Sequence, residues 1–140
     1  MKAVRPKLPL VYSCSGCSSA AQMANQLAVR LDREGLAEMS CIAGVGGGVP
    51  GLVKTATSGR AILALDGCAM ACVSACLQRV AVRADLHIQL ADFGVKKRLH
   101  TDVDPSELNS IFQHIVSPAA KALNTAANRI GNPDGNKSQA

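Results

Sequence analysis

The chain alternates short apolar runs with segments whose apolar residues recur every three or four positions. The short runs predict four strands, over residues 7–13, 37–43, 60–65 and 86–92. The helical spacing is clearest over residues 19–34, a segment that ends at Gly35. Its predicted buried stripe consists of Ala20, Met23, Ala24, Leu27, Ala28 and Leu31. Further helices are expected over residues 50–57, over 68–80, and from 105 to about 122, the last capped by Asp104.

Strands that alternate with helices form right-handed βαβ units, which build parallel sheets covered by helices. The pattern therefore predicts a small three-layer (Rossmann-like) α/β domain with about four parallel strands flanked by helices. Residues 1–126 are expected to form one α/β metal-binding domain, and the polar segment 127–140 a disordered tail. The sequence has no internal repeat and gives no sign of a second domain.

Four cysteines fall at equivalent places in this topology. Cys14 and Cys41 lie at the ends of the first and second predicted strands, Cys68 directly follows the third, and Cys72 comes one turn later. The carboxyl ends of parallel strands meet at one edge, and neighbouring strands lie about 4.8 Å apart. Sulfur atoms around a tetrahedral zinc ion are roughly 3.8 Å apart. A single cysteine is usually a small buried apolar residue, but four at one edge favour a metal site.

Several motifs resemble one known family, the DGC-domain proteins, which are small bacterial proteins thought to bind zinc. The similar segments are Cys14-Ser15-Gly16 with Asn25-Gln26-Leu27-Ala28, residues 38–47, Asp66-Gly67-Cys68 with Cys72, and residues 92–97. The resemblance runs from about Val11 to Arg98. It implies zinc, one ion per chain, held by Cys14, Cys41, Cys68 and Cys72.

Two further cysteines depart from the family pattern and keep other functions open. Cys17 forms a Cys-x-x-Cys motif with Cys14 at a strand-to-helix junction, where a thiol redox or sulfur-transfer enzyme would place its thiols. In that alternative Cys17 or Cys72 resolves an intermediate on Cys14, and Cys17 could instead replace a zinc ligand. An iron–sulfur cluster also takes four thiolates. Cys76 lies two turns into its predicted helix and is expected to face the core.

Other motifs carry weaker signals. Asp66 precedes the predicted third helix, so it is a helix cap, a hydrogen-bonding partner of the cysteine site or a general base. Residues 46–51 match the glycine pattern of dinucleotide-binding loops, but a tight loop or anion-binding nest is favoured because the helix that follows is short. His87, His100 and His114 lack ligand spacing and are expected on the surface or in the core.

Composition narrows the function classes. The net charge of +5 comes mostly from scattered basic residues, and three aromatic residues are too few for stacking on single-stranded nucleic acid. No run reaches the roughly 18 apolar residues of a membrane span, and the N-terminus lacks a signal-peptide core. We therefore expect a cytoplasmic protein without nucleic-acid or membrane partners. A zinc-binding protein with a sensing or accessory role is the leading hypothesis. Enzymatic activity, substrate, protein partner and homo-oligomer formation stay open.

Overall fold

The computed structural model describes the backbone of residues 7–131 and the side chains of residues 7–126. Its four strands are β1 (Leu10–Ser13), β2 (Glu38–Met39), β3 (Ile62–Asp66) and β4 (Leu86–Gln89). All pair in parallel, in the order β2-β1-β3-β4. The predicted α/β fold class and four-stranded parallel sheet are confirmed.

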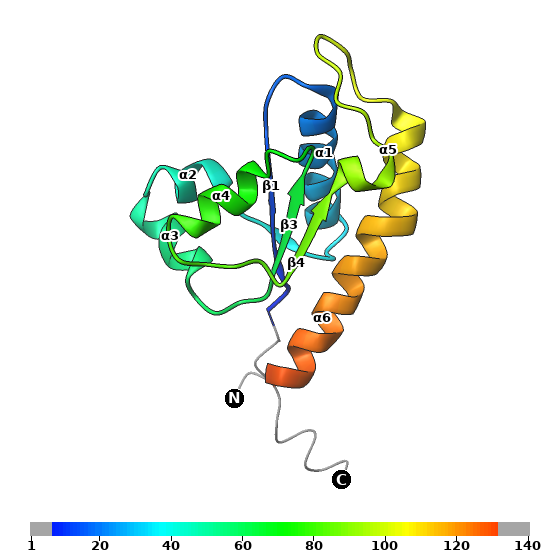
Figure 1. The fold of residues 1–140 in the computed structure, drawn as a ribbon. Coiled ribbons are helices and arrows are strands. Elements are labelled where there is room, and N and C mark those ends of the chain that lie inside the picture. Colours follow the sequence, from blue (N-terminus) through cyan, green and yellow to red (C-terminus); the bar gives the residue numbers. More distant parts are fainter. Residues whose placement is uncertain (1–6, 132–140) are drawn as a thin grey trace.

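Helices cover both faces of the sheet and give three layers (Figure 1). The helices are α1 (Ser19–Arg33), α2 (Ile42–Gly46), α3 (Pro50–Ala56), α4 (Cys72–Gln78), α5 (Pro105–Ile111) and α6 (Ser117–Gly131). Helices α2, α3 and α4 lie on one side, and α1, α5 and α6 lie on the other. The central strands β1 and β3 are buried along their whole length because both faces are covered.

Helix α1 agrees with the pattern of its sequence. All six residues of the predicted stripe are buried, and the helix packs on β1, β2 and β3. Ser18 caps it by accepting a hydrogen bond from the Ala21 N–H at 3.1 Å. The glycine after the helix, Gly35, adopts a positive φ of 72°, as a C-terminal glycine is expected to do.

The prediction of a strand over residues 37–43 is wrong for most of that segment. Strand β2 has only two residues, and the chain turns into helix α2 at Ile42, directly after Cys41. The reason lies in two glycines that let helices approach closely. A Cβ on Gly44 would lie 1.9 Å from Leu52 of α3, and one on Gly46 would lie 2.8 Å from the Cys76 sulfur of α4. The glycine-rich segment therefore serves helix packing, and it follows a helix where a dinucleotide-binding loop follows a strand.

The third predicted helix begins later than expected. Residues 68–70 form a turn, Ala71 adopts a left-handed conformation with φ 51°, and α4 starts at Cys72. Cys68 therefore precedes the helix, and the three cysteines of this segment do not form one helical row.

The C-terminal helices form a continuous helical segment with one local irregularity. Asp104 caps α5 by accepting a hydrogen bond from the Ser106 N–H at 2.9 Å, as predicted. A π-helical turn over Phe112–Val116 joins α5 to α6. Pro118 accounts for this turn, because its missing N–H cannot complete the α-helical bond to His114.

Helix α6 extends to Gly131, beyond the expected domain limit at residue 126, and residues 132–140 of the expected tail lie outside the described residues. Strand β4 stops at Gln89, earlier than expected, and is followed by a 3₁₀ turn over Leu90–Phe93. Across residues 7–131, no helix combines the length and apolar character needed to cross a membrane.

Candidate thiol site at the carboxyl edge of the sheet

The centre of the candidate site is the pair of neighbouring strands β1 and β3. The chain leaves β1 towards β2 on one side and leaves β3 towards β4 on the other, so their carboxyl ends form the topological switch point. The Cys14 N–H donates to the Leu65 carbonyl at 3.0 Å, which continues the pairing by one residue. The Gly67 N–H then donates to the Cys14 sulfur at 3.2 Å. The ends of the two strands are thus joined through the Cys14 thiol.

Gly67 is required at this place by space. A Cβ on this residue would lie 2.7 Å from both the carbonyl carbon and the oxygen of Ala20, at the start of α1. No side chain fits against that rigid backbone, so only glycine lets β3 end so close to α1. Its N–H is thereby aimed at the Cys14 sulfur.

Three thiols share this part of the edge. Cys14 is buried with 7% of its surface exposed, Cys68 is half-buried and Cys72 is exposed. Burial raises the pKa of the Cys14 thiol above its ordinary value, and the hydrogen bond from Gly67 partly opposes this shift. Asp66, and Cys72 and Cys68 when ionised, raise the pKa further. Cys68 directly follows Gly67, whose N–H donates to the Cys14 sulfur, so Cys68 lies beside Cys14 in the structure.

Asp66 is the buried polar centre of the site. Only 1% of its surface is exposed, yet both carboxylate oxygens have partners. Oδ1 accepts a hydrogen bond from the Val73 N–H at 2.9 Å, and Oδ2 lies 2.8 Å from His87 Nε2. The first contact caps helix α4, as one interpretation of the sequence predicted. Asp66 lies directly before the segment 67–72 and is hydrogen-bonded to Val73 directly after it. It thereby fixes both ends of this segment, called the 67–72 turn, which contains Cys68 and Cys72.

His87 lies at the surface, within the range of places expected for it, but its contact with Asp66 was not predicted from the sequence. In the sheet register it pairs with Ala64, two residues before Asp66 on the same face of β3. That shared face is the signal that could have found it, once the pairing of β3 with β4 was assumed. Ser74 Oγ lies 3.5 Å from the same ring nitrogen as Asp66. A Ser-His-Asp relay needs its acid and its serine on opposite ring nitrogens, so this cluster is not such a triad.

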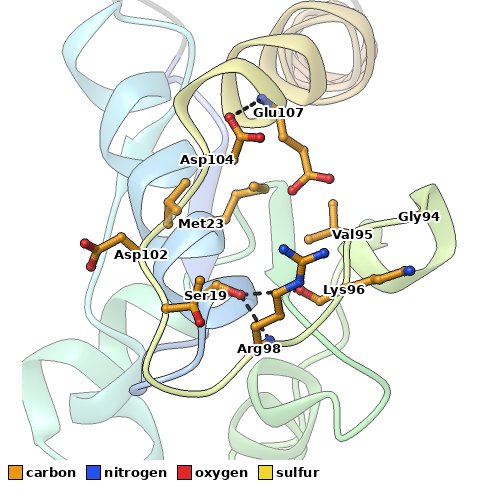
Figure 2. A pocket seen from close by; sticks show the side chains of 11 residues that line it. Ser19, Met23, Gly94, Val95, Lys96, Arg98, Asp102, Asp104 and Glu107 are labelled. Carbon is orange, nitrogen blue, oxygen red and sulfur yellow. Dashed lines mark hydrogen bonds between the residues drawn. The ribbon is translucent and has the colours of Figure 1, made fainter.

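A basic residue also lies beside the thiols. The Lys97 ammonium is 3.8 Å from the Cys68 sulfur and 3.7 Å from the Met70 sulfur. Its segment is fixed to the start of α1, because the Ser19 N–H donates to the Arg98 carbonyl at 2.8 Å and Ser19 Oγ accepts from the Arg98 N–H at 3.1 Å (Figure 2). Lys97 therefore brings one positive charge to the cysteine edge.

The neighbouring cavity of about 190 Å³ mixes both signs of charge. Lys96 and Arg98 line it together with Asp102, Asp104 and Glu107 (Figure 2). This mixture does not favour a simple anion site.

The remaining cysteines lie elsewhere. Cys41 precedes α2 on the β2 side of β1, is exposed, and lines a groove with Ser13 and Ser15. Cys17 is exposed and lines a different cavity together with His100. Cys76 is half-buried and packs against Gly46 of α2, in partial agreement with its expected place in the core. The structure therefore gathers Cys14, Cys68 and Cys72, and it leaves Cys41 on the other side of β1.

The donor chemistry of the gathered thiols suits zinc, which prefers thiolate sulfur, and the Lys97 charge and Gly67 N–H would offset negative charge there. Among the residues whose side chains are described, no three Cys, His, Asp or Glu groups are arranged to hold a metal ion as they stand. Residue type and location thus fit zinc, whereas coordination requires the side chains to draw together. The predicted ligand set of Cys14, Cys41, Cys68 and Cys72 stays a prediction.

The fold and the gathered thiols define a small cysteine-rich α/β domain, and comparison with known proteins places it. The family model described as the DGC domain matches residues 10–115, so the chain belongs to the DGC domain family, as its motifs indicated. It is 55% identical over 117 residues to the Pseudomonas aeruginosa protein named "Anaerobic and virulence modulator AnvM". That match covers 81% of this chain and 89% of the relative. No solved structure matches the chain.

Proposed function

We propose that this protein binds one zinc ion through cysteine thiolates at the carboxyl edge of the sheet and acts as a metal-sensing or accessory module. The observation that carries the proposal is the gathering of Cys14, Cys68 and Cys72 at the switch point between β1 and β3, where hydrogen bonds from Gly67 to Cys14 and from Val73 to Asp66 hold the segment that contains Cys68 and Cys72. Cys41 is the fourth ligand of the proposed set, and it lies on the β2 side of β1, directly before α2.

The surroundings of the thiols support metal binding in three ways. The Gly67 N–H that donates to Cys14 stabilises a negatively charged sulfur. Lys97 brings a positive charge to the Cys68 sulfur. Asp66 fixes the turn that carries two of the ligands, as residues behind a metal centre commonly do. When bound, zinc would supply charge neutralisation and a cross-link between the ends of two strands and the 67–72 turn.

Thiol redox chemistry is the second candidate, and the geometry favours it less. An attacking cysteine needs a lowered pKa, whereas burial raises the pKa of Cys14. Its proposed partner Cys17 faces a different cavity.

The sensing role in the proposal agrees with the name of the Pseudomonas aeruginosa relative, which describes a modulator.

Metal content of anaerobically purified protein, measured by native mass spectrometry with elemental analysis, tests the proposal. We expect one zinc per chain, and loss of that zinc in Cys14→Ser, Cys68→Ser and Cys72→Ser. Cys76→Ser is the matched control, because Cys76 lies one turn beyond Cys72 on the same helix and packs against α2. Cys41→Ser decides whether the fourth ligand comes from the β2 side.

Three results would contradict zinc binding. Wild-type protein that is metal-free while all its thiols are reduced would contradict the proposal that the protein binds zinc. Equal zinc content in the Cys72→Ser and Cys76→Ser variants would remove the assigned site. Detection of iron together with labile sulfide would show that the protein binds an iron–sulfur cluster instead of zinc.

A further inference from the structure

A groove on the β2 side of β1 has the features of a small-molecule binding site that is separate from the gathered thiols. It has a volume of about 650 Å³, within the range of roughly 300–1,000 Å³ typical of ligand sites. It runs beside the edge strand β2, between α1 and the helices α2 and α3. Its lining residues are Ser13, Ser15, Asn25, Asp32, Arg33, Met39, Ser40, Cys41, Ile42, Ala43 and Leu52.

The decisive feature of this groove is a buried hydroxyl that lacks a partner. Ser13, the last residue of β1, is 3% exposed, and its Oγ makes no hydrogen bond within the described residues. Buried polar groups in proteins are nearly always paired, because an unpaired one loses its bonds to water without replacement. Because Ser13 lines the groove, a ligand that displaces the atoms covering this hydroxyl can supply the missing hydrogen-bond partner.

The charge of the groove restricts what can bind. Asp32 and Arg33 are its only two charged lining residues, and they form an ion pair with each other. Asp32 also accepts a hydrogen bond from the Met39 N–H at 2.9 Å. The two charges compensate each other, so the described lining residues carry no net charge that would favour an ion over a neutral ligand.

The walls and the edge strand restrict the ligand further. Met39, Ile42 and Leu52 are half-buried apolar residues of the groove that also pack on the core. The Met39 N–H points away from β1, and Asp32 occupies it. A peptide adding a strand to β2 would need that donor, so the groove favours a compact apolar molecule over an extended peptide.

We propose that this groove binds an uncharged amphipathic small molecule whose carbonyl or hydroxyl group hydrogen-bonds Ser13 and whose apolar body lies against Ile42 and Leu52. The groove lies on the opposite side of β1 from Cys68 and Cys72, but Cys41, the fourth ligand of the proposed zinc set, lines it, so ligand binding is measured on metal-free protein. In metal-free protein, a failure of ligand binding can be distinguished from a failure of zinc binding, because zinc content is measured in a separate experiment.

Three eight-carbon probes test the proposal on the full chain: 2-octanone, octanoate and octylamine. We expect 2-octanone to shift the backbone amide NMR signals of Ser15, Ile42 and Leu52, and to bind at least about tenfold more tightly than either charged probe. The Ser13→Ala variant should bind 2-octanone about fivefold more weakly, since one buried hydrogen bond is lost. Ser58→Ala, an exposed hydroxyl outside the groove, is the matched control.

The outcomes separate cleanly. Because Ser13 Oγ has no hydrogen-bond partner among residues 7–126, Ser13→Ala should keep the fold, and the ligand series tests the site without any substitution. Absence of 2-octanone binding, or amide shifts confined to other regions, would overturn the proposal. So would equal binding by the Ser13→Ala variant or by the charged probes. Unchanged 2-octanone binding in Cys68→Ser protein is expected, because that variant alters only the thiol site.

Discussion

On the β3 side of strand β1, the buried polar groups are tied together. Asp66 uses both oxygens, and the Gly67 N–H meets the Cys14 sulfur. On the β2 side, the strand is two residues long, and the Ser13 hydroxyl beside it has no hydrogen-bond partner in the part of the chain that the structure describes. Both regions lie at the carboxyl edge of one sheet, yet one is closed and braced while the other is open.

The difference teaches where each kind of chemistry fits. A braced site holds ligands whose positions must be defined, and a metal centre needs such positions. A groove whose wall contains a buried hydroxyl without a partner suits a ligand that can supply the missing hydrogen bond. Substitutions on the two sides should therefore change the free energy of unfolding in opposite directions, and the following experiments test that contrast.

Asp66→Ala should have the largest effect on stability. The change leaves the Val73 N–H and the His87 ring without their buried partner, so we expect a loss of about 2–4 kcal/mol in the free energy of unfolding. Urea denaturation of metal-free protein measures it. Asp102→Ala, at an exposed carboxylate, should stay within about 0.5 kcal/mol of wild type. Equal effects of the two substitutions would show that Asp66 braces nothing.

Gly67→Ala should have the second-largest effect on stability. We expect a loss of about 1–3 kcal/mol in the free energy of unfolding, because the added methyl group overpacks against the Ala20 backbone. Gly51 in α3, on the β2 side, is its counterpart, because a Cβ there meets no atom within 4 Å. Gly51→Ala should stabilise by up to about 1 kcal/mol through helix propensity. Thermal unfolding of both variants tests the contrast, which fails if their melting temperatures shift in the same direction.

The glycines of α2 show how much of the fold could be predicted from the sequence. The stripe of α1 and the alternation of strands and helices predicted the parallel sheet, because periodicity records burial directly. The helix at residues 42–46 escaped prediction because Gly44 and Gly46 are poor helix formers. Their value lies in contacts with Leu52 and Cys76, which are invisible without the tertiary structure.

The candidate site was predictable in part for the same reason. Cys14 and Cys68 follow central strands, so topology alone brought them together. The position of Cys41 depended on the length of an edge strand, which sequence patterns define poorly. The contact between His87 and Asp66 depended on the register of β3 and β4, and no local signal encodes that register.

Ser13→Ala should have a smaller effect of the opposite sign. Removal of a buried hydroxyl that has no partner relieves a desolvation penalty, so we expect a gain of about 1 kcal/mol in the free energy of unfolding. Chemical denaturation of metal-free protein measures it, beside Ser58→Ala as the neutral control. A loss above about 1 kcal/mol would mean that the hydroxyl has a structural partner, and the two sides of β1 would then be alike.

The smallest expected effect is a shift in thiol reactivity at Cys76. Burial raises the pKa of this thiol, and the negative charge of Cys72 raises it further. The proton is therefore retained to higher pH than on a free cysteine, and alkylation by iodoacetamide should be slow near pH 8 and recover as pH rises through the folded-state pKa. Cys72→Ser should move this profile to lower pH, whereas Cys41→Ser should leave it unchanged, because Cys41 does not contribute to the shift. Peptide mass spectrometry across a pH series of metal-free protein resolves each cysteine. A profile that responds equally to both substitutions would contradict the separation of the two sides.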